Sequence, residues 1–120
     1  MKLNFDAMRD MLFVIEDQPR DIDVNKVLFD KKLEKYTNKN ELCYTLEKMI
    51  EAGLLDGKPY PSKTKTVLLI SSITVDGHKF IENVRQDTAW NKIKQTISKN
   101  GITTIGSLIP VVFEAIKTGL

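Results

Sequence analysis

The segment ITVDGHKFIENVRQDTAWNKIK, residues 73–94, holds the only histidine and the only tryptophan of the chain. It begins where an apolar run, residues 67–71, ends, and Thr74 then offers a side-chain oxygen of the kind that caps helices. Asp76 follows in the first turn, where a carboxylate interacts favourably with the helix dipole. The apolar side chains after it recur at helical spacing: Phe80, Ile81 and Val84. The segment therefore predicts a strand exit followed by a capped amphipathic helix.

A bend near residues 87–88 is expected next, and the buried stripe then continues with Trp90, Ile93 and Ile97. His78 lies in the first turn of the helix, so we interpret it as a capping or packing histidine. Cys43 is the only cysteine, and its leucine neighbours predict a buried small hydrophobe. With one His, one Cys and no glycine-rich phosphate loop, we expect no catalytic residues, no metal, no cofactor and no enzyme.

Upstream of the apolar run, the sequence predicts a helix over residues 39–52. Asn38 stands three residues before Glu41 in an approximate capping box, and Gly53 supplies the C-terminal stop. The buried face of this helix is predicted to consist of Leu42, Leu46, Met49 and Ile50. Leu54 and Leu55 then begin a strand whose partner is residues 67–71, and the connection contains glycine, two prolines and lysines. The prediction is a hairpin with a basic tip.

Elements nearer the two ends are less sharply indicated. Residues 6–17 predict a first helix, with Asn4 or Asp6 as N-cap, that ends before Pro19. Residues 20–26 are interpreted as a loop. Periodicity does not decide whether residues 27–29 form a strand and residues 30–36 a turn of helix. The last helix begins either near residue 107, or near residue 103 with a kink at Pro110.

Length and composition fit a soluble protein of one domain. The chain has 120 residues, of which 42% are hydrophobic and 28% charged. It contains no apolar run of the roughly 20 residues needed to cross a bilayer and no secretory signal at its start, so we expect a cytoplasmic protein without membrane contact. Residues 1–56 carry nine Lys and Arg against twelve Asp and Glu, a balance of −3, whereas residues 57–120 carry nine against four, a balance of +5. The basic half fits either a phosphate-binding surface or ordinary solvated lysines.

Two stretches resemble known regulators. LEKMIEAGLL, residues 46–55, resembles the end of the recognition helix in winged-helix repressors of the MarR and PadR type, and residues 69–80 resemble their wing exit. The resemblance implies an α+β fold, mainly α: a winged helix-turn-helix with a two-stranded wing and additional C-terminal helices. The single domain, residues 1–120, would have a core of about residues 1–86 and a C-terminal helical extension of about residues 87–120.

Over about residues 1–100, the chain also resembles an uncharacterised family of small bacterial and prophage proteins, a domain of unknown function. The resemblance rests on DAMRDMLFVIE, residues 6–16, and on residues 69–94. The chain departs from this family at residues 27–35, at Thr45 and in the proline-bearing tail. Membership implies a phage or mobile-element origin and carries no established activity.

For DNA binding, the resemblance places helix 39–52 in a groove and the hairpin against phosphates. The predicted groove-reading residues are Lys39, Asn40, Tyr44, Thr45 and Lys48, and the predicted phosphate contacts are Lys58, Lys63 and Lys65. Against this hypothesis, residues 39–52 hold two Lys and three Glu, a net charge of −1, and no Arg for a bidentate guanine contact. The leading hypothesis is a DNA-binding transcriptional regulator with double-stranded DNA as its partner. The alternative is a winged-helix protein-interaction module that engages a host or phage protein.

The tail is apolar over much of its circumference, so it either packs deeply in the monomer or forms a dimer seam. We predict a homodimer through the C-terminal helices, with an interface formed by Ile105, Ile109, Val112, Phe113 and Ile116.

Overall fold

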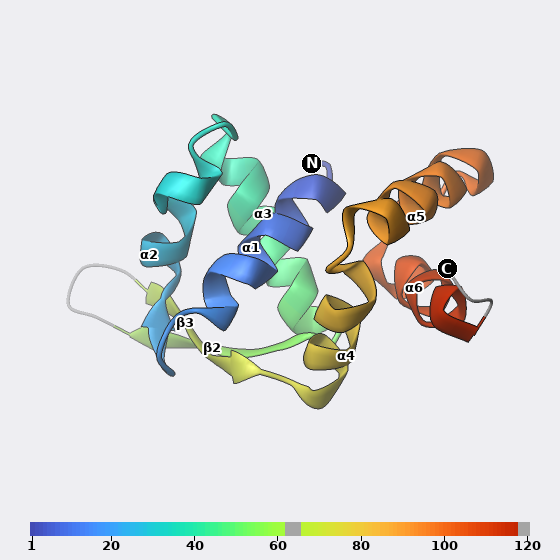
Figure 1. Ribbon diagram of the computed structural model, residues 1–120. Coiled ribbons are helices and arrows are strands. Elements are labelled where there is room, and N and C mark those ends of the chain that lie inside the picture. The colour runs from blue at the N-terminus through green and yellow to red at the C-terminus, as the bar shows by residue number, and fades with distance from the viewer. Residues whose placement is uncertain (62–65, 118–120) are drawn as a thin grey trace.

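The computed structural model describes residues 1–61 and 66–117, and it has an α+β fold that is mainly helical (Figure 1). The elements in chain order are α1 (Phe5–Glu16), β1 (Ile22–Asp23), α2 (Val24–Leu28), the 3-10 helix η1 (Lys31–Leu33), α3 (Lys39–Glu51), β2 (Leu55–Pro61), β3 (Thr66–Ile73), α4 (Val75–Val84), α5 (Asp87–Asn100) and α6 (Ile105–Lys117). None of the helices in these two described ranges is long and apolar enough to span a bilayer.

A small antiparallel sheet with the order β1-β3-β2 supports the helices. β2 and β3 form the predicted hairpin, and the two-residue strand β1 pairs with the other edge of β3 through Ile22 and Ile70. Figure 1 shows α1 and α3 above the sheet, with α2 at one end of the molecule and α5 and α6 at the opposite end. The sheet therefore lies below the helices, between α2 at one end of the molecule and the C-terminal helices at the other (Figure 1).

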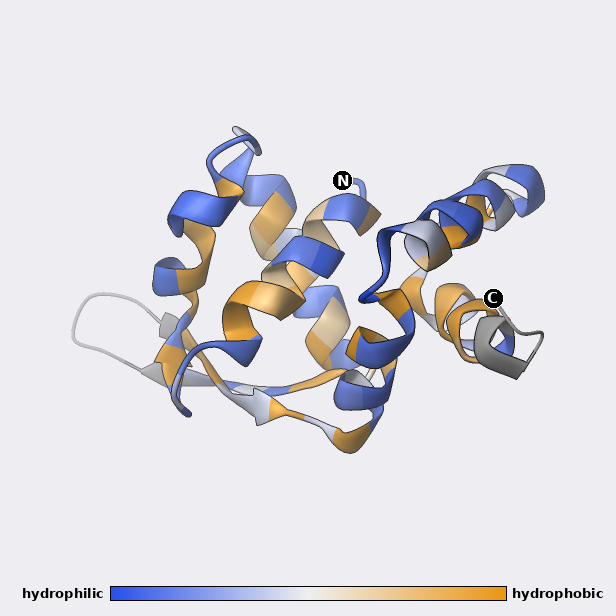
Figure 2. Cartoon of the chain, viewed as in Figure 1, coloured by the Kyte–Doolittle hydropathy of each residue, from blue (hydrophilic) through white to orange (hydrophobic). Residues whose placement is uncertain are grey.

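The core lies between α1, α3 and α4. The largest side chains with almost no exposed surface include Met8, Met11 and Leu12 of α1, and Phe80 of α4. Figure 2 shows hydrophilic residues on the outward sides of α1, α2 and α5, as an amphipathic pattern requires. Of the second predicted stripe, Trp90 and Ile93 are buried with this core, and Ile97 is partly buried against it.

Helix caps that the sequence predicted are present. Asn4, rather than Asp6, caps α1, because its Oδ1 accepts a hydrogen bond from the Ala7 amide at 2.9 Å. Asn38 accepts from the Glu41 amide at 3.1 Å and begins α3. Thr74 accepts from the Gly77 amide at 2.9 Å and begins α4. These caps are confirmed, because each depends only on residues close in sequence.

Two glycines fix the passage from α3 into the hairpin and from the hairpin into α4. Gly53 has φ of 84°, the left-handed conformation that ends a helix. A Cβ at Gly77 would lie 2.1 Å from the Leu54 carbonyl oxygen and 2.7 Å from a methyl carbon of Ile73. The start of α4 therefore packs directly on the backbone that leaves α3.

Residues 20–29 differ from the prediction. The predicted loop contains β1, and residues 27–29, which periodicity left undecided, are the end of α2 and its C-cap Phe29. The reason is a local cap: Asp23 accepts a hydrogen bond from the Asn25 amide at 2.8 Å and starts a helix at Val24. Val27 and Leu28 follow at helical spacing and are buried. The predicted helical turn over residues 30–36 shortens to η1.

The C-terminal extension folds back onto the body. The predicted bend is a break, since α4 ends at Val84 and α5 begins at Asp87. α6 starts at Ile105, midway between the two predicted start points, with Pro110 inside it. Ile105 and Val112, assigned to a dimer interface, are buried in the chain's own core, where α6 packs on α4 and α5. That assignment is corrected. Ile109 and Phe113 are half-buried, and the Ile116 side chain is outside the described part.

Candidate nucleic-acid interface

The N-terminal end of α3 is open to solvent. Asn38 and Asn40 are exposed there, while Lys39 is half-buried. The Lys39 ammonium donates to the Leu33 carbonyl oxygen at 3.3 Å and lies 5.6 Å from the ring centroid of Phe29. Lys39 and Asn40 therefore occupy the end of a helix where polar groups can meet a ligand, and Lys39 is positioned by η1 and α2.

Helix α2 presents a second exposed surface beside this end. Val24, Val27 and Leu28 are buried, so the residues between and after them point outward. We call the exposed trio Asn25, Lys26 and Phe29 the α2 outer face. Phe29 is 68% exposed, which is unusual for a side chain of this size, and the Lys39 ammonium lies over it. This face combines an amide, a cation and an aromatic ring, and Lys39 of α3 adds a second cation beside it.

Positive charge gathers around the α2 outer face. Residues 24–40 carry five lysines against Asp30 and Glu34, so their net charge is 5 − 2 = +3. Lys32 pairs with Asp17 at 3.3 Å and Lys35 pairs with Asp10 at 3.3 Å. Within the ranges that the structure describes, Lys26 and Lys31 form no ion pair. These two lysines are free to meet phosphates.

The hairpin extends from the same end of the molecule. Lys58 of β2 is exposed. It pairs with Leu69 of β3, and Leu69 also pairs on its other side with Asp23, the residue immediately before α2. Lys58 is thus in register with the strand that leads into α2. Lys63 and Lys65 lie outside the described residues.

Thr45 does not face solvent, so the prediction that it reads a groove is wrong. Its side chain is fully buried; the hydroxyl donates to the Glu41 carbonyl oxygen at 2.8 Å and accepts from the Asn4 amide at 3.2 Å. The position belongs to the buried stripe, since Thr45 follows Leu42 by three residues and precedes Met49 by four. Its polar side chain concealed this in the sequence, and its role is to fix the N-terminus of α1 on α3.

Tyr44, near the middle of α3, and Lys48, nearer its C-terminal end, line a groove of about 780 Å³ with the N-terminal segment and residues 102–106. The Lys48 ammonium contacts Glu51 at 2.9 Å and lies 5.3 Å from the ring centroid of Tyr44. The hydrogen bond to Glu51 raises the pKa of Lys48. Lys39 is about 13 Å from Lys48 along the helix axis, at a rise of roughly 1.5 Å per residue. The predicted groove-reading residues therefore separate into two sites, and only Lys39 and Asn40 adjoin the basic end.

Sequence reasoning missed the α2 outer face. The signal was present in Asp23, which is a good N-cap, and in the spacing of Val24, Val27 and Leu28. That pattern places Asn25, Lys26 and Phe29 off the apolar stripe. The three residues were overlooked because residues 20–26 were interpreted as a loop and the structure of residues 27–29 was left open.

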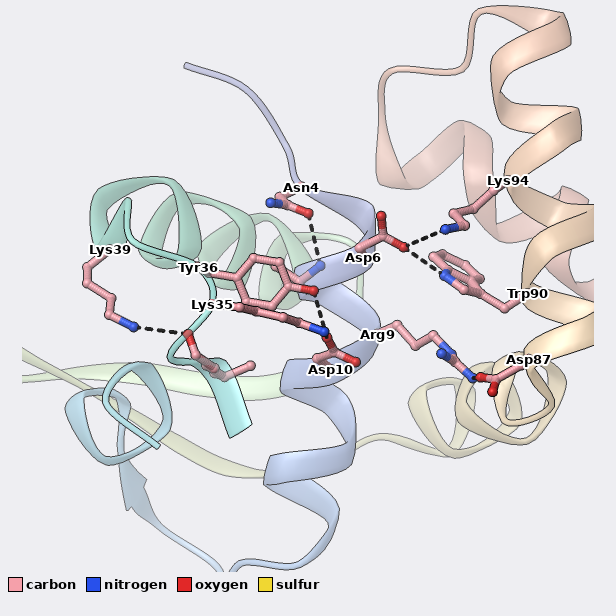
Figure 3. A network of polar contacts seen from close by, with 12 residues as sticks. Asn4, Asp6, Arg9, Asp10, Lys35, Tyr36, Lys39, Asp87, Trp90 and Lys94 are labelled. Carbon is pink, nitrogen blue, oxygen red and sulfur yellow. Dashed lines mark hydrogen bonds and ion pairs between the residues drawn. The ribbon is translucent and has the colours of Figure 1, made fainter. Parts of the chain in front are cut away.

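A polar network on the other side of α1 joins α1 to α5 (Figure 3). The indole of Trp90 donates to Asp6 at 2.9 Å, and the Lys94 ammonium contacts the same carboxylate at 3.1 Å. Arg9 contacts Asp87 at 2.9 Å and donates from Nε to the Val84 carbonyl oxygen at 2.7 Å. Trp90 is thus a core residue held by a hydrogen bond, and the network acts as a tie between helices.

The remaining groups that could carry chemistry are Tyr36, Cys43 and His78. Tyr36 donates to Asp10 at 2.6 Å, and burial together with this bond raises the pKa of Tyr36. Burial likewise raises the pKa of the half-buried Cys43 thiol, which disfavours a reactive thiolate. His78 is exposed, so it is not a core-packing histidine. No group of three or more His, Cys, Asp or Glu suited to a metal occurs among the residues that the structure covers.

Replacing Trp90 by phenylalanine is expected to cost about 1–2 kcal/mol of unfolding free energy at pH 7, because the Asp6 carboxylate loses a donor. Burial alone would raise the pKa of Asp6, but Trp90 and Lys94 together lower it from its ordinary 3.8. The contact therefore stabilises above pH 3.8 and is lost as the pH falls through the folded pKa. Urea unfolding followed by circular dichroism at pH 7 and near pH 2.5 measures both values. A difference between variant and wild type that persists undiminished in acid would contradict this account.

Comparison with known proteins gives a family. The family described as "Hypothetical protein (DUF2513)" matches residues 2–103. A protein of Haemophilus influenzae strain Rd that carries the name "Uncharacterized protein" is 26% identical over 102 residues, which are 85% of this chain and 83% of that protein. No solved structure matches the chain. The family match spans α1 through the whole of α5, so it includes the α2 outer face, the hairpin and the tie between α1 and α5. On this match, the chain belongs to the DUF2513 family.

Proposed function

We propose that this protein is a winged-helix DNA-binding protein that regulates transcription, of phage or mobile-element origin. One observation carries the proposal: α3 passes directly into the β2–β3 hairpin, while the strand β1 between α1 and α2 pairs with β3. This order corresponds to the helix, strand, helix, helix and wing of a winged helix-turn-helix. In that motif, α3 is the recognition helix and the hairpin is the wing.

The surface proposed to meet DNA is the basic end of the molecule. Lys39 and Asn40 stand at the N-terminal end of α3, which is the part of a recognition helix that contacts base edges. Asparagine can read adenine with its amide, and lysine can read guanine or hold a phosphate. Lys26, Lys31 and Lys58 are exposed, and we propose that they hold phosphates on either side of a groove. Lys63 and Lys65 are proposed to extend these contacts from the hairpin tip.

The phosphate contacts can be tested by removing two lysines from different elements. The test uses the double variant Lys26→Gln and Lys58→Gln. For duplex DNA, its plot of log association constant against log salt concentration is expected to have a slope shallower by about two, because each phosphate contact contributes about 0.9 to the slope. Fluorescence anisotropy with a labelled duplex measures this slope. The matched control is Lys92→Gln with Lys99→Gln on α5, two exposed lysines outside the proposed surface, and it should leave the slope unchanged. Equal slopes for the two double variants would contradict the assignment.

A second candidate function has an observation in its favour. Beyond Asn40, the exposed positions of α3 include Glu47 and Glu51, and Lys48 is neutralised by its contact with Glu51. An acidic surface repels phosphate, so this half of α3 fits a host or phage protein better than DNA. Affinity capture from nuclease-treated lysate distinguishes the functions: a stoichiometric protein that is retained by wild type and lost with Glu47→Lys favours the second candidate. Capture that disappears with nuclease favours DNA.

A further inference from the structure

The most unusual exposed side chain is Phe29. An aromatic residue at the C-cap of a helix would ordinarily turn inward, yet Phe29 remains 68% exposed while Val27 and Leu28 beside it are almost fully buried. Phe29 belongs neither to the described core nor to the partly buried apolar side chains packed against it. Instead, the Lys39 ammonium lies 5.6 Å from the ring centroid. The ring is thus held at the surface with a cation beside it.

Charge determines which ligand chemistry suits this ring. The segment around it, residues 24–40, has a net charge of +3, and the nearest acidic side chains have structural tasks. Asp23 caps α2 through the Asn25 amide, and Asp30 caps η1 through the Lys32 amide. An aromatic face between lysines is complementary to a ligand that has a flat ring and an adjacent anion. A nucleotide within a strand has both.

We propose that Phe29 stacks on an unpaired nucleic-acid base, with Lys26 and Lys39 holding the phosphates on either side of it. Lys26 precedes Phe29 by three residues and therefore lies on the same exposed face of α2. Lys39 approaches the ring from the start of α3. The site takes a base that has left its pair, as in a gap, a bulge or a locally opened duplex, because a base inside a stack offers no free face. This inference rests on the proposed function and adds a preference for distorted DNA.

The test compares an intact labelled duplex with the same duplex carrying a three-nucleotide single-stranded gap, by fluorescence anisotropy at fixed low salt. Stacking on one base is expected to make wild type bind the gapped duplex about tenfold more tightly. Phe29→Leu, which remains apolar but has no aromatic face, should abolish that preference, and Phe29→Trp should retain it. Lys26→Gln should weaken binding to both duplexes by a similar factor. Because Phe29 is largely exposed, the Phe29 variants should have the same midpoint of urea unfolding as wild type.

The outcomes separate this inference from the function on which it rests. Equal affinity of wild type for both duplexes, or a preference that survives Phe29→Leu, overturns base stacking and leaves duplex binding intact. Wild type that binds neither duplex at low salt overturns both proposals. Binding in which Phe29→Leu loses affinity equally for both duplexes also overturns stacking, since the ring would then contact the duplex exterior.

Discussion

Gly77→Ala is expected to lose about 3 kcal/mol of unfolding free energy, because the added methyl group overpacks the start of α4. The new Cβ would lie 2.1 Å from the Leu54 carbonyl oxygen and 3.1 Å from the Leu54 carbonyl carbon. Both are backbone atoms, so no side-chain rotation relieves the clash. The Leu54 oxygen also accepts a hydrogen bond from the Thr74 amide at 3.2 Å, and the Gly77 amide donates to Thr74. Displacing α4 would therefore disturb the junction between α3, the hairpin and α4.

Urea unfolding followed by circular dichroism measures this loss, and Gly106→Ala is its matched control. Gly106 also lies in a helix, but a Cβ there meets nothing within 4 Å. Alanine has the higher helix propensity, so the control should be neutral or stabilised by up to about 1 kcal/mol. A Gly77→Ala variant within about 1 kcal/mol of wild type would show that α4 is not packed on Leu54 in this way.

Val112→Asp is expected to detach α6 from the body, because a carboxylate would be buried without a partner. The free energy of local unfolding of α6 should fall by roughly 3–4 kcal/mol. Val112 has no exposed surface, and its carbonyl oxygen accepts a hydrogen bond from Asn83 of α4 at 3.2 Å. Its neighbours on the buried side of α6 are Ile105 and Leu108. Hydrogen exchange measured by mass spectrometry should report lost protection throughout α6.

Ser107→Asp controls for the added charge, since Ser107 is exposed on the same helix and should leave exchange in α6 unchanged. The experiment also distinguishes the corrected role of Val112 from the dimer seam that the sequence predicted. If α6 were exposed in the monomer and covered only in a dimer, Val112→Asp would dissociate the protein without local unfolding. Sedimentation velocity on the same samples would reveal that outcome.

Local signals in the sequence were sufficient for the long elements. α3 follows from Asn38, the apolar stripe and Gly53, and α4 follows from Thr74 and its own stripe. In each case the capping residue acts within three positions, so no tertiary information is needed. β1 was not predictable in the same way, because a two-residue strand exists only through its pairing with β3. Its sequence carries no periodicity of its own.

The candidate site was predicted less well, and for a related reason. Which side of α3 is open depends on where the N-terminus of α1 packs, and that contact buries Thr45 through the Asn4 amide. The sequence suggested that a polar residue on a helix would be exposed. Conversely, the structure of the short apolar run at residues 27–29 was left open, whereas the cap at Asp23 starts a helix whose C-cap, Phe29, is exposed. The burial of Thr45 thus depends on a partner far away in sequence, whereas the position of Phe29 follows from a local cap.

The central claim, that this DUF2513 member binds DNA through its basic end, is tested most directly by titrating wild type into labelled duplex from its own promoter region at about 50 and 200 mM salt. With about three or four phosphate contacts from Lys26, Lys31, Lys39 and Lys58, the account predicts binding at low salt and a slope of log K against log salt of about −3. Absence of binding at 50 mM salt, or binding with the same affinity at both salt concentrations, would contradict the claim.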